Sequence, residues 1–504
     1  MAKGSPLRAL VAGLFCLAAL HAPARAAESD ALPAPAEQLP EPVARVATAL
    51  GVPADAISLW VAELDADRPL VSWRARVARS PASTMKLVTT FAALEGLTPA
   101  YRWRTEVFAL GPIRDGVLSG DLLLRGFGDP FLVAEEFWKL VGAIRATGLR
   151  EIRGDLVFDT GAFVPDEQPR SAFDGQPDRI YNLPPHPLLV NFNAMRFEFA
   201  PDPVAGRVRV AVEPALANVE VVNRLGLVDG PCEGYQRGVA LNVVDAVRRE
   251  RVLLEGRFPT GCQRYGMTRS VLTPEAYAWG LFGLYWNQLG GRLDGGWRLG
   301  TLPADLIPED PETGIPMPEE SDALVTVHRS RPLGDVVRLV NKYSNNVMTR
   351  QLYLTLGGER FGLPADRDKG QRALVEILAR NGVETTGLVI DNPSGLTRDG
   401  RISAEQLGRL LQAAWRSPYM PEFVSSLALS GLDGTVSDRF MDMPQAGRMH
   451  LKTGTLDDVS AIAGYVQTRT DRRRVVVVLV NAPRAHRGPG EEIQDALLDW
   501  VYRD

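Results

Sequence analysis

Hydrophobic and polar positions recur with different periods along the chain, and the changes of period divide it into three stretches. Near the N-terminus, the apolar runs 57–64 and 70–74 predict two strands joined by a polar turn, and residues 83–96 have helical character. From about residue 326 helical patterns return, and two β-branched runs precede a last helical segment. We predict further helices at 41–50, 332–342, 345–357, 370–382, 403–416 and 490–502, and strands at 459–468 and 474–481.

Residues 99–325 follow a third pattern, in which short β-like runs alternate with Gly, Pro and Asp turns. Because strands are predicted at both ends of the chain, we expect a discontinuous α/β domain of residues 27–98 and 326–504, with helices on the faces of its sheet. The region between them is then a β-rich insertion, which we interpret as two nested subdomains. Its predicted strands are 104–109, 116–125, 151–158, 195–199, 207–213 and 218–223.

The first 26 residues have the features of a secretory signal. Lys3 and Arg8 form a basic end, and the apolar core that follows is about a dozen residues long, too short to span a bilayer comfortably. Ala24-Arg25-Ala26 fits the small-x-small cleavage rule. We therefore expect cleavage near Ala26 and export, with at most peripheral membrane contact; the alternative is a retained membrane anchor.

Composition narrows the class of protein. The chain has 504 residues and a formal net charge of −5, which becomes more negative if the basic leader is removed. It has no basic run, so a nucleic-acid role is not indicated. The length suggests two or three domains. The histidines that follow the leader are scattered and lack the spacing of metal ligands, so we expect no metal and no cofactor.

Two cysteines, Cys232 and Cys262, remain once the leader and Cys16 are gone. In an oxidising compartment two cysteines are expected to form one disulfide. Closing this loop would contribute roughly 3–4 kcal/mol in the chain-entropy model. The alternative is two separate thiols, and neither is a catalytic arrangement.

The candidate chemistry begins at Ser83-Thr84-Met85-Lys86, which places a hydroxyl and an amine one helical turn apart. Serine needs a base to take its proton, and a free lysine is neutral at pH 7 only at a penalty of roughly 4.6 kcal/mol. Burial and a second cation both lower that penalty, so the pair predicts another basic residue nearby. Lys452 is the candidate, one of only six lysines among 56 basic residues.

Two further motifs follow along the chain. Ser344-Asn345-Asn346 can be catalytic, but Ser and Asn also cap helices, and this segment precedes the predicted helix 345–357. Lys452-Thr453-Gly454 precedes a strand-like run, and its alternative interpretation is a solvated strand edge with a turn glycine. The order of the three motifs is typical of penicillin-recognising serine acyltransferases.

The contexts of these motifs resemble the D-alanyl-D-alanine carboxypeptidase/endopeptidase family, the class C low-molecular-mass penicillin-binding proteins (peptidase family S13). The 261 positions between Ser83 and Ser344 fit the inserted domains of that family. The resemblance covers nearly the whole mature chain and implies a serine β-lactamase/transpeptidase-like domain with an antiparallel sheet. The segments that carry it are 81–90, 126–130, 341–346, 394–398, Gly434-Thr435, 452–456 and 464–466.

The resemblance implies that Ser83 is the nucleophile and that Lys86, held neutral beside Lys452, takes its proton. It also implies that Ser344 and Lys452 relay a proton to the leaving amine. Asn346 would bind the side amide of the substrate and help to place Lys86.

The same resemblance implies that Thr453, Gly454 and Thr455 bind the substrate and the oxyanion. Lys452 and the two threonines would grip a terminal carboxylate, and the N–H groups of Ser83 and Thr455 would hold the oxyanion.

The expected substrates are peptidoglycan peptides that end in D-Ala-D-Ala or carry D-Ala cross-links, and the expected inhibitors are β-lactam antibiotics. The implied location is the periplasm. Two alternatives remain at this stage. One is a β-lactamase or esterase on the same fold, and the other is a catalytically silent cell-wall-binding protein.

Overall fold

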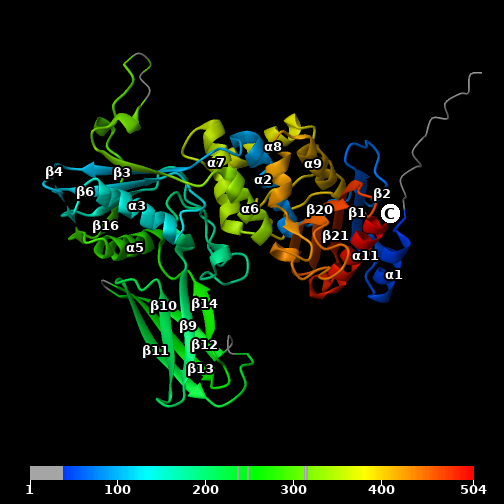
Figure 1. Cartoon of the computed structure of the whole chain (residues 1–504), viewed down its shortest axis with the longest axis horizontal. Coiled ribbons are helices and arrows are strands. Elements are labelled where there is room, and N and C mark those ends of the chain that lie inside the picture. The colour runs from blue at the N-terminus through cyan, green and yellow to red at the C-terminus, as the bar shows by residue number, and fades with distance from the viewer. Residues whose placement is uncertain (1–37, 235–237, 247–248, 312, 314–315) are drawn as a thin grey trace, which may run out of the picture. The chain divides into compact units, whose positions relative to one another are not determined.

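A computed structural model describes residues 38–504 except 235–237, 247–248, 312 and 314–315 (Figure 1). The proposed signal peptide, with its cleavage near Ala26, lies outside the described residues. None of the described helices is long and apolar enough to cross a membrane.

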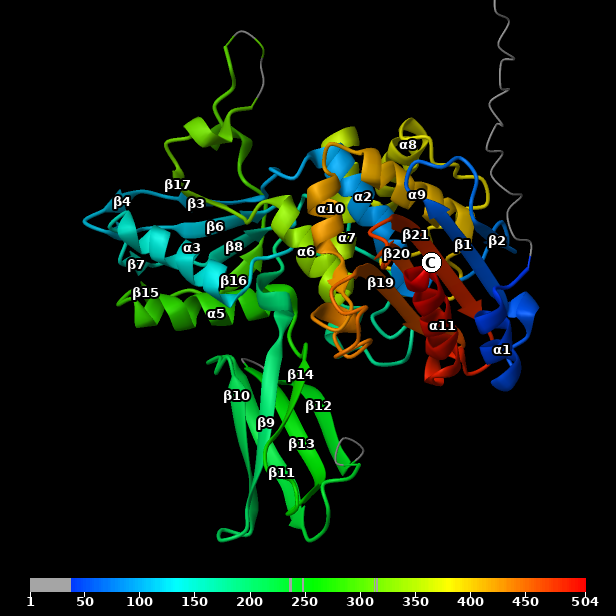
Figure 2. The ribbon, with the colours of Figure 1, turned by 45° about the vertical axis from the view of Figure 1, so that its right-hand side comes forward.

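The sheet that carries the site has six antiparallel strands, assembled from both ends of the chain as the sequence predicts (Figure 2). Its strand order is β18-β19-β20-β21-β1-β2. Strand β1 pairs with the last strand, β21, on one side and with β2 on the other. Their bounds are β1 Ile57–Glu63, β2 Val71–Trp73, β18 Ala428–Leu429, β19 Met449–Leu456, β20 Val459–Gln467 and β21 Arg473–Asn481.

Both faces of this sheet are covered, because successive side chains of a strand point to opposite faces. On one face, α1 (Glu41–Ala49) and α11 (Pro489–Arg503) share a core with residues such as Val478 and Val480. On the other face, Val477 and Leu479 belong to a larger core with the central helices. Those helices are α2 Met85–Leu97, α6 Leu333–Tyr343, α7 Asn346–Phe361, α8 Arg367–Arg380, α9 Ala404–Arg416 and α10 Met420–Ser426.

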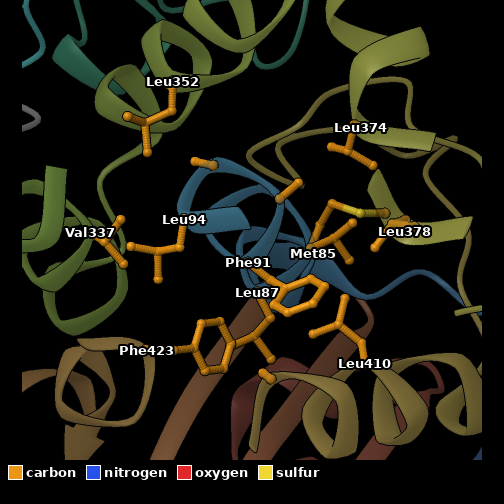
Figure 3. Packing of buried hydrophobic residues seen from close by; sticks show 14 of the residues in the cluster. Met85, Leu87, Phe91, Leu94, Val337, Leu352, Leu374, Leu378, Leu410 and Phe423 are labelled. Atoms are coloured by element: carbon orange, nitrogen blue, oxygen red, sulfur yellow. The ribbon is translucent and has the colours of Figure 1, made fainter. Parts of the chain in front are cut away.

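Helix α2 lies at the centre of the larger core and is apolar on nearly all sides. Phe91 contacts Phe423 edge to face, with the ring centroids 6.2 Å apart, and other α2 side chains meet α6, α7 and α8 (Figure 3). Eleven of the thirteen α2 residues are buried. This burial fixes the helix that begins directly after Ser83.

Of the five sheets in the described residues, four are built from the predicted insertion, whose last strand extends past residue 325 to Arg329. A five-stranded sheet has the order β16-β8-β6-β3-β17, and a four-stranded sheet has the order β15-β7-β5-β4. The bounds are β3 Arg104–Leu110, β4 Ile113–Arg114, β5 Val117–Leu118, β6 Asp121–Gly126, β7 Glu151–Ile152, β8 Leu156–Asp159, β15 Arg292–Leu293, β16 Trp297–Leu299 and β17 Leu324–Arg329.

Two three-stranded sheets, β10-β9-β14 and β11-β13-β12, form the rest of the insertion. A disulfide joins Cys232 to Cys262 beside them. The bounds are β9 Met195–Asp202, β10 Arg207–Glu213, β11 Val219–Val228, β12 Val239–Ala246, β13 Arg249–Pro259 and β14 Tyr265–Arg269.

Two long helices of the insertion were not among the predicted elements: α3 (Ala134–Ala146) and α5 (Pro274–Gln288). The reason is clearest for α5. Its buried residues include neighbours such as Tyr277 and Ala278, and Leu281 and Phe282, so the apolar positions do not form a single stripe. A helix that is buried on several sides lacks the period that identifies an amphipathic helix.

Candidate active site

Ser83 lies in a 3₁₀ turn, Ala82–Thr84, immediately before α2. Two glycines let other segments approach this turn closely. A Cβ on Gly395 would stand 1.9 Å from the Ala82 carbonyl oxygen, and one on Gly454 would stand 2.9 Å from the Ser83 nitrogen. The Ser83 turn is therefore held between the loop at Gly395 and strand β19, and its side chain remains partly accessible.

Lys86 is fully buried, and its Nζ lies 2.8 Å from the Ser83 Oγ. It also donates to the Asn346 Oδ1 at 2.7 Å and to the Ser394 carbonyl oxygen at 2.7 Å. Both of these partners are acceptors. A neutral amine can give its two hydrogens to them, which leaves its lone pair directed at the Ser83 hydroxyl. The three contacts thus suit a base that accepts the Ser83 proton.

Electrostatics favour that neutral form. Burial lowers the pKa of Lys86 well below its usual value, and the positive charges of Lys452 and Arg350 lower it further. Arg350 lies on α7, one turn after Asn346, and burial lowers its own pKa to about 10. The contribution of Lys452 agrees with the sequence argument, which required a second cation near the Ser83–Lys86 pair.

Ser344 occupies the break between two helices. It ends α6 in the left-handed conformation, with φ of 55°, while Asn345 caps α7 by accepting a hydrogen bond from the Met348 N–H. The capping role that the sequence offered as an alternative is therefore present, and Asn345 fills it. On the two sides of this break, Ser344 lies within hydrogen-bond distance of Lys452, and Asn346 lies within hydrogen-bond distance of Lys86.

Lys452 is fully buried on β19 and donates to the Ser344 Oγ at 3.0 Å and to the Thr453 carbonyl oxygen at 2.7 Å. Burial lowers its pKa to about 7. Lys452, Thr453 and Gly454 lie inside strand β19, whereas the sequence placed them before the strand-like run. Their alternative interpretation as a solvated edge with a turn glycine is wrong, because Lys452 and Gly454 are buried and lie opposite Ala463 and Ala461 of β20.

The remaining predicted residues lie on the same strand; Thr453 is partly buried and Thr455 is exposed. The structure thus brings together all eight candidate residues, which are Ser83, Lys86, Ser344, Asn346, Lys452, Thr453, Gly454 and Thr455. Cys232 and Cys262 belong to the inserted region and take no part in the site.

Sequence reasoning missed several neighbours of these residues. The Ser394 carbonyl oxygen holds Lys86, and Thr435 receives a hydrogen bond from Thr453. Both belong to segments that carried the family resemblance, which was the available signal. Arg350 had a weaker signal, its position four residues after Asn346 on a predicted helix.

A cavity of about 460 Å³ is lined by neighbours of these residues and by none of the eight candidates themselves. Arg350 lines it together with Asn392 and Pro393, which directly precede the Lys86 contact at Ser394, and with Asp166 from the inserted region. Across the described ranges, no group of three or more His, Cys, Asp or Glu side chains could hold a metal ion.

Comparisons with known proteins agree with this architecture. A D-alanyl-D-alanine carboxypeptidase from Actinomadura sp. (strain R39) is 30% identical over 432 residues, which span 83% of this chain and 76% of that protein. The crystal structure of penicillin binding protein 4 from Haemophilus influenzae covers 92% of this chain and 99% of its own at 21% identity, with a TM-score of 0.73. A second structure of that protein, complexed with a novel β-lactam, gives a TM-score of 0.71 at 20% identity, with the same coverage of both chains.

The fold is therefore that of the penicillin-binding protein class, an α/β domain with an antiparallel sheet between helices. The model of the D-Ala-D-Ala carboxypeptidase 3 (S13) family matches residues 41–503, and the chain belongs to this family. The resemblance drawn from the motifs and the predicted fold class are both confirmed.

Proposed function

We propose that this protein is a serine-type D-Ala-D-Ala carboxypeptidase, a D,D-endopeptidase or both, and that it acts on peptidoglycan stem peptides through an acyl-enzyme on Ser83. The observation that carries the proposal is the environment of Lys86. Its buried amine meets two acceptors and the Ser83 hydroxyl, and its pKa is held well below the usual value. Such a group is a base at neutral pH.

In the acylation step, the Ser83 Oγ attacks the carbonyl carbon of the penultimate D-alanine while its proton moves to the Lys86 Nζ. The resulting oxyanion accepts hydrogen bonds from the backbone N–H groups of Ser83 and Thr455. Losing one such donor typically costs a factor of about 10²–10³ in rate. When the C–N bond breaks, the leaving amine takes a proton from Ser344, which regains one from Lys452 along their 3.0 Å hydrogen bond.

In the deacylation step, water attacks the ester carbonyl carbon and gives up a proton, which replaces the one that Lys452 lost during acylation. The Ser83 oxygen leaves as a hydroxyl with the proton that Lys86 took from it. In the intact substrate, before the peptide bond is cleaved, the free carboxylate of the terminal D-alanine would be held by the Lys452 ammonium and by the hydroxyls of Thr453 and Thr455. A β-lactam acylates the same serine, but its leaving group stays tethered and blocks the approach of water.

The cavity lined by Arg350, which lies one helical turn after Asn346, offers space for a peptide substrate. It has about 460 Å³ of space and carries both charge signs, with Asp166 and Arg350 among its lining residues. It therefore has room and polar contacts for the stem peptide on the acyl side of the cleaved bond. Peptidoglycan is the source of such peptides, and the proposed location of the protein is therefore the periplasm.

The test is release of D-alanine from a peptide that ends in D-Ala-D-Ala, measured with wild type, Ser83→Ala and the control Ser425→Ala. Ser425 is an exposed hydroxyl on α10 that hydrogen-bonds only its own helix among the contacts of the described structure. We expect release by wild type and Ser425→Ala, and a loss of at least a thousandfold in Ser83→Ala. Equal release by Ser83→Ala would contradict the proposal.

A further inference from the structure

A turn between β18 and β19 contacts the site, because its Thr435 is hydrogen-bonded to Thr453. This turn, residues 429–436, is closed by a hydrogen bond from the Gly431 N–H to the Val436 carbonyl oxygen. The Asp433 carboxylate accepts another from the Leu429 N–H at 2.8 Å. The turn is therefore a defined structure, and it presents the exposed side chain of Thr435.

An ion pair ties this turn to the helix that carries Ser344. Lys342 lies two residues before Ser344 on α6, and its side chain is only 5% exposed. Its Nζ donates to the Asp433 Oδ2 at 2.6 Å and to the Leu427 carbonyl oxygen at 2.9 Å. Burial opposes ionisation of Asp433, but the hydrogen bond from Lys342 holds the pKa of that carboxyl below its usual value.

A glycine brings the turn against the end of the same helix. Gly434 has φ of +62°, and a Cβ there would stand 2.8 Å from the Lys342 carbonyl oxygen and 2.7 Å from the Ala428 Cβ. No other residue could take both this backbone conformation and this separation without movement. This contact therefore fixes the position of the backbone at Thr435 relative to the end of α6, where Ser344 lies.

Thr435 meets the strand that is proposed to bind the substrate carboxylate. The Thr453 hydroxyl donates to the Thr435 Oγ1 at 2.7 Å. A hydroxyl that accepts one hydrogen bond still has its own proton to donate. The exposed Thr435 hydroxyl can therefore donate that proton to an anion in the site, supported from behind by Thr453.

We propose that Thr435 is a further binding residue for the carboxylate of the substrate, held in place for that role by the Lys342–Asp433 ion pair. This inference rests on the proposed function, because the carboxylate is that of the terminal D-alanine. Thr435 touches the substrate, whereas Lys342 and Asp433 are positioning residues that act through the turn. The pair also links the carboxylate site to Ser344, which lies at the end of the same helix.

The test compares two substrates, a peptide that ends in D-Ala-D-Ala and its C-terminal amide. Thr435→Val removes the hydroxyl and keeps the shape. We expect it to lower the preference in kcat/KM for the carboxylate over the amide roughly tenfold, the effect of one hydrogen bond to a charged group. Thr435→Ser should retain the preference. The control Thr48→Val makes the same change at an exposed hydroxyl of α1, on the other face of the sheet, and should behave as wild type.

A double-variant comparison tests the positioning role. Asp433→Asn should lower the carboxylate preference in the wild-type background but have no further effect on it in the Thr435→Val background. A general loss of folding would instead reduce the rates for both substrates equally. Melting temperatures of all variants verify that the compared proteins are folded.

Two outcomes overturn the inference, and they differ from failure of the proposed function. If wild type releases D-alanine but Thr435→Val keeps the wild-type preference, Thr435 does not bind the carboxylate. The preference is kept whether both rates stay as in wild type or both fall by the same factor. If wild type releases neither D-alanine from the acid nor D-alanine amide from the amide, the proposed function fails and the inference fails with it.

Discussion

The pKa values of two buried lysines set the pH range in which this site can work. Lys86 must be neutral to accept the Ser83 proton, and burial with the nearby positive charges of Lys452 and Arg350 lowers its pKa. Lys452 must be charged to attract a carboxylate, and burial lowers its pKa to about 7. Because the two groups interact, the titration belongs to the pair.

A pH profile of kcat/KM follows from these shifts. As the pH falls, the Lys86 amine becomes protonated and the rate falls. As the pH rises through about 7, Lys452 loses its proton and binding of the carboxylate weakens. We therefore expect a bell-shaped profile whose alkaline limb lies near pH 7, measured as D-alanine release between about pH 4 and 10.

Lys452→Arg provides the control for the assignment of the alkaline limb. A guanidinium stays charged throughout this range, so the variant should lose the alkaline limb even though its rate is lower. An unchanged alkaline limb in Lys452→Arg would assign that limb to a different group.

At the scale of elements, the site depends on how closely three segments meet around the Ser83 turn. Helix α2 is fixed by its buried side chains, and the loop at Gly395 and strand β19 press on the turn that precedes it. Both glycines at these contacts are therefore needed for packing, and Gly395 is needed also for its backbone conformation, with φ of +77°.

Gly395→Ala tests this arrangement. Gly395 has φ of +77°, and its added methyl would lie 1.9 Å from the Ala82 carbonyl oxygen, so the Ser83 turn must move. We expect a loss of at least a hundredfold in kcat/KM, because small displacements of reacting groups carry large rate penalties.

Gly382→Ala is the matched control. Gly382 has φ of +71° but nothing within 4 Å of an added Cβ, so it carries the backbone strain without the clash. It should lower the stability by about 1 kcal/mol and leave the activity unchanged. If both variants lose activity to the same degree, the close approach at Gly395 is not what positions Ser83.

Amphipathic elements were the part of the fold that the sequence could predict. Strand β1 and helices α9 and α11 fall within one or two residues of their expected bounds, because each has one clearly apolar face or run. Strand β19 was not predicted, because polar residues at 452, 453 and 455 interrupt its apolar pattern. Those residues are polar because they face the site, so the function of the strand concealed its structure.

At the scale of the whole molecule, the site joins parts of the chain that are distant in sequence. Lys86 contacts Asn346 across 260 positions and Ser394 across 308, while Lys452 contacts Ser344 across 108. The motifs identified most of these residues but not how they meet. The contact between Thr435 and Thr453 has no sequence signal of its own, because it depends on a turn held by the pairing of Lys342 with Asp433.

The central claim is that Ser83 forms a covalent acyl-enzyme, and intact mass measurement with and without benzylpenicillin tests it most directly. The account predicts that wild type gains one drug mass and that Ser83→Ala does not. Failure of wild type to gain mass while the drug stays intact would contradict the account. The absence of an adduct together with hydrolysed drug would instead indicate a β-lactamase.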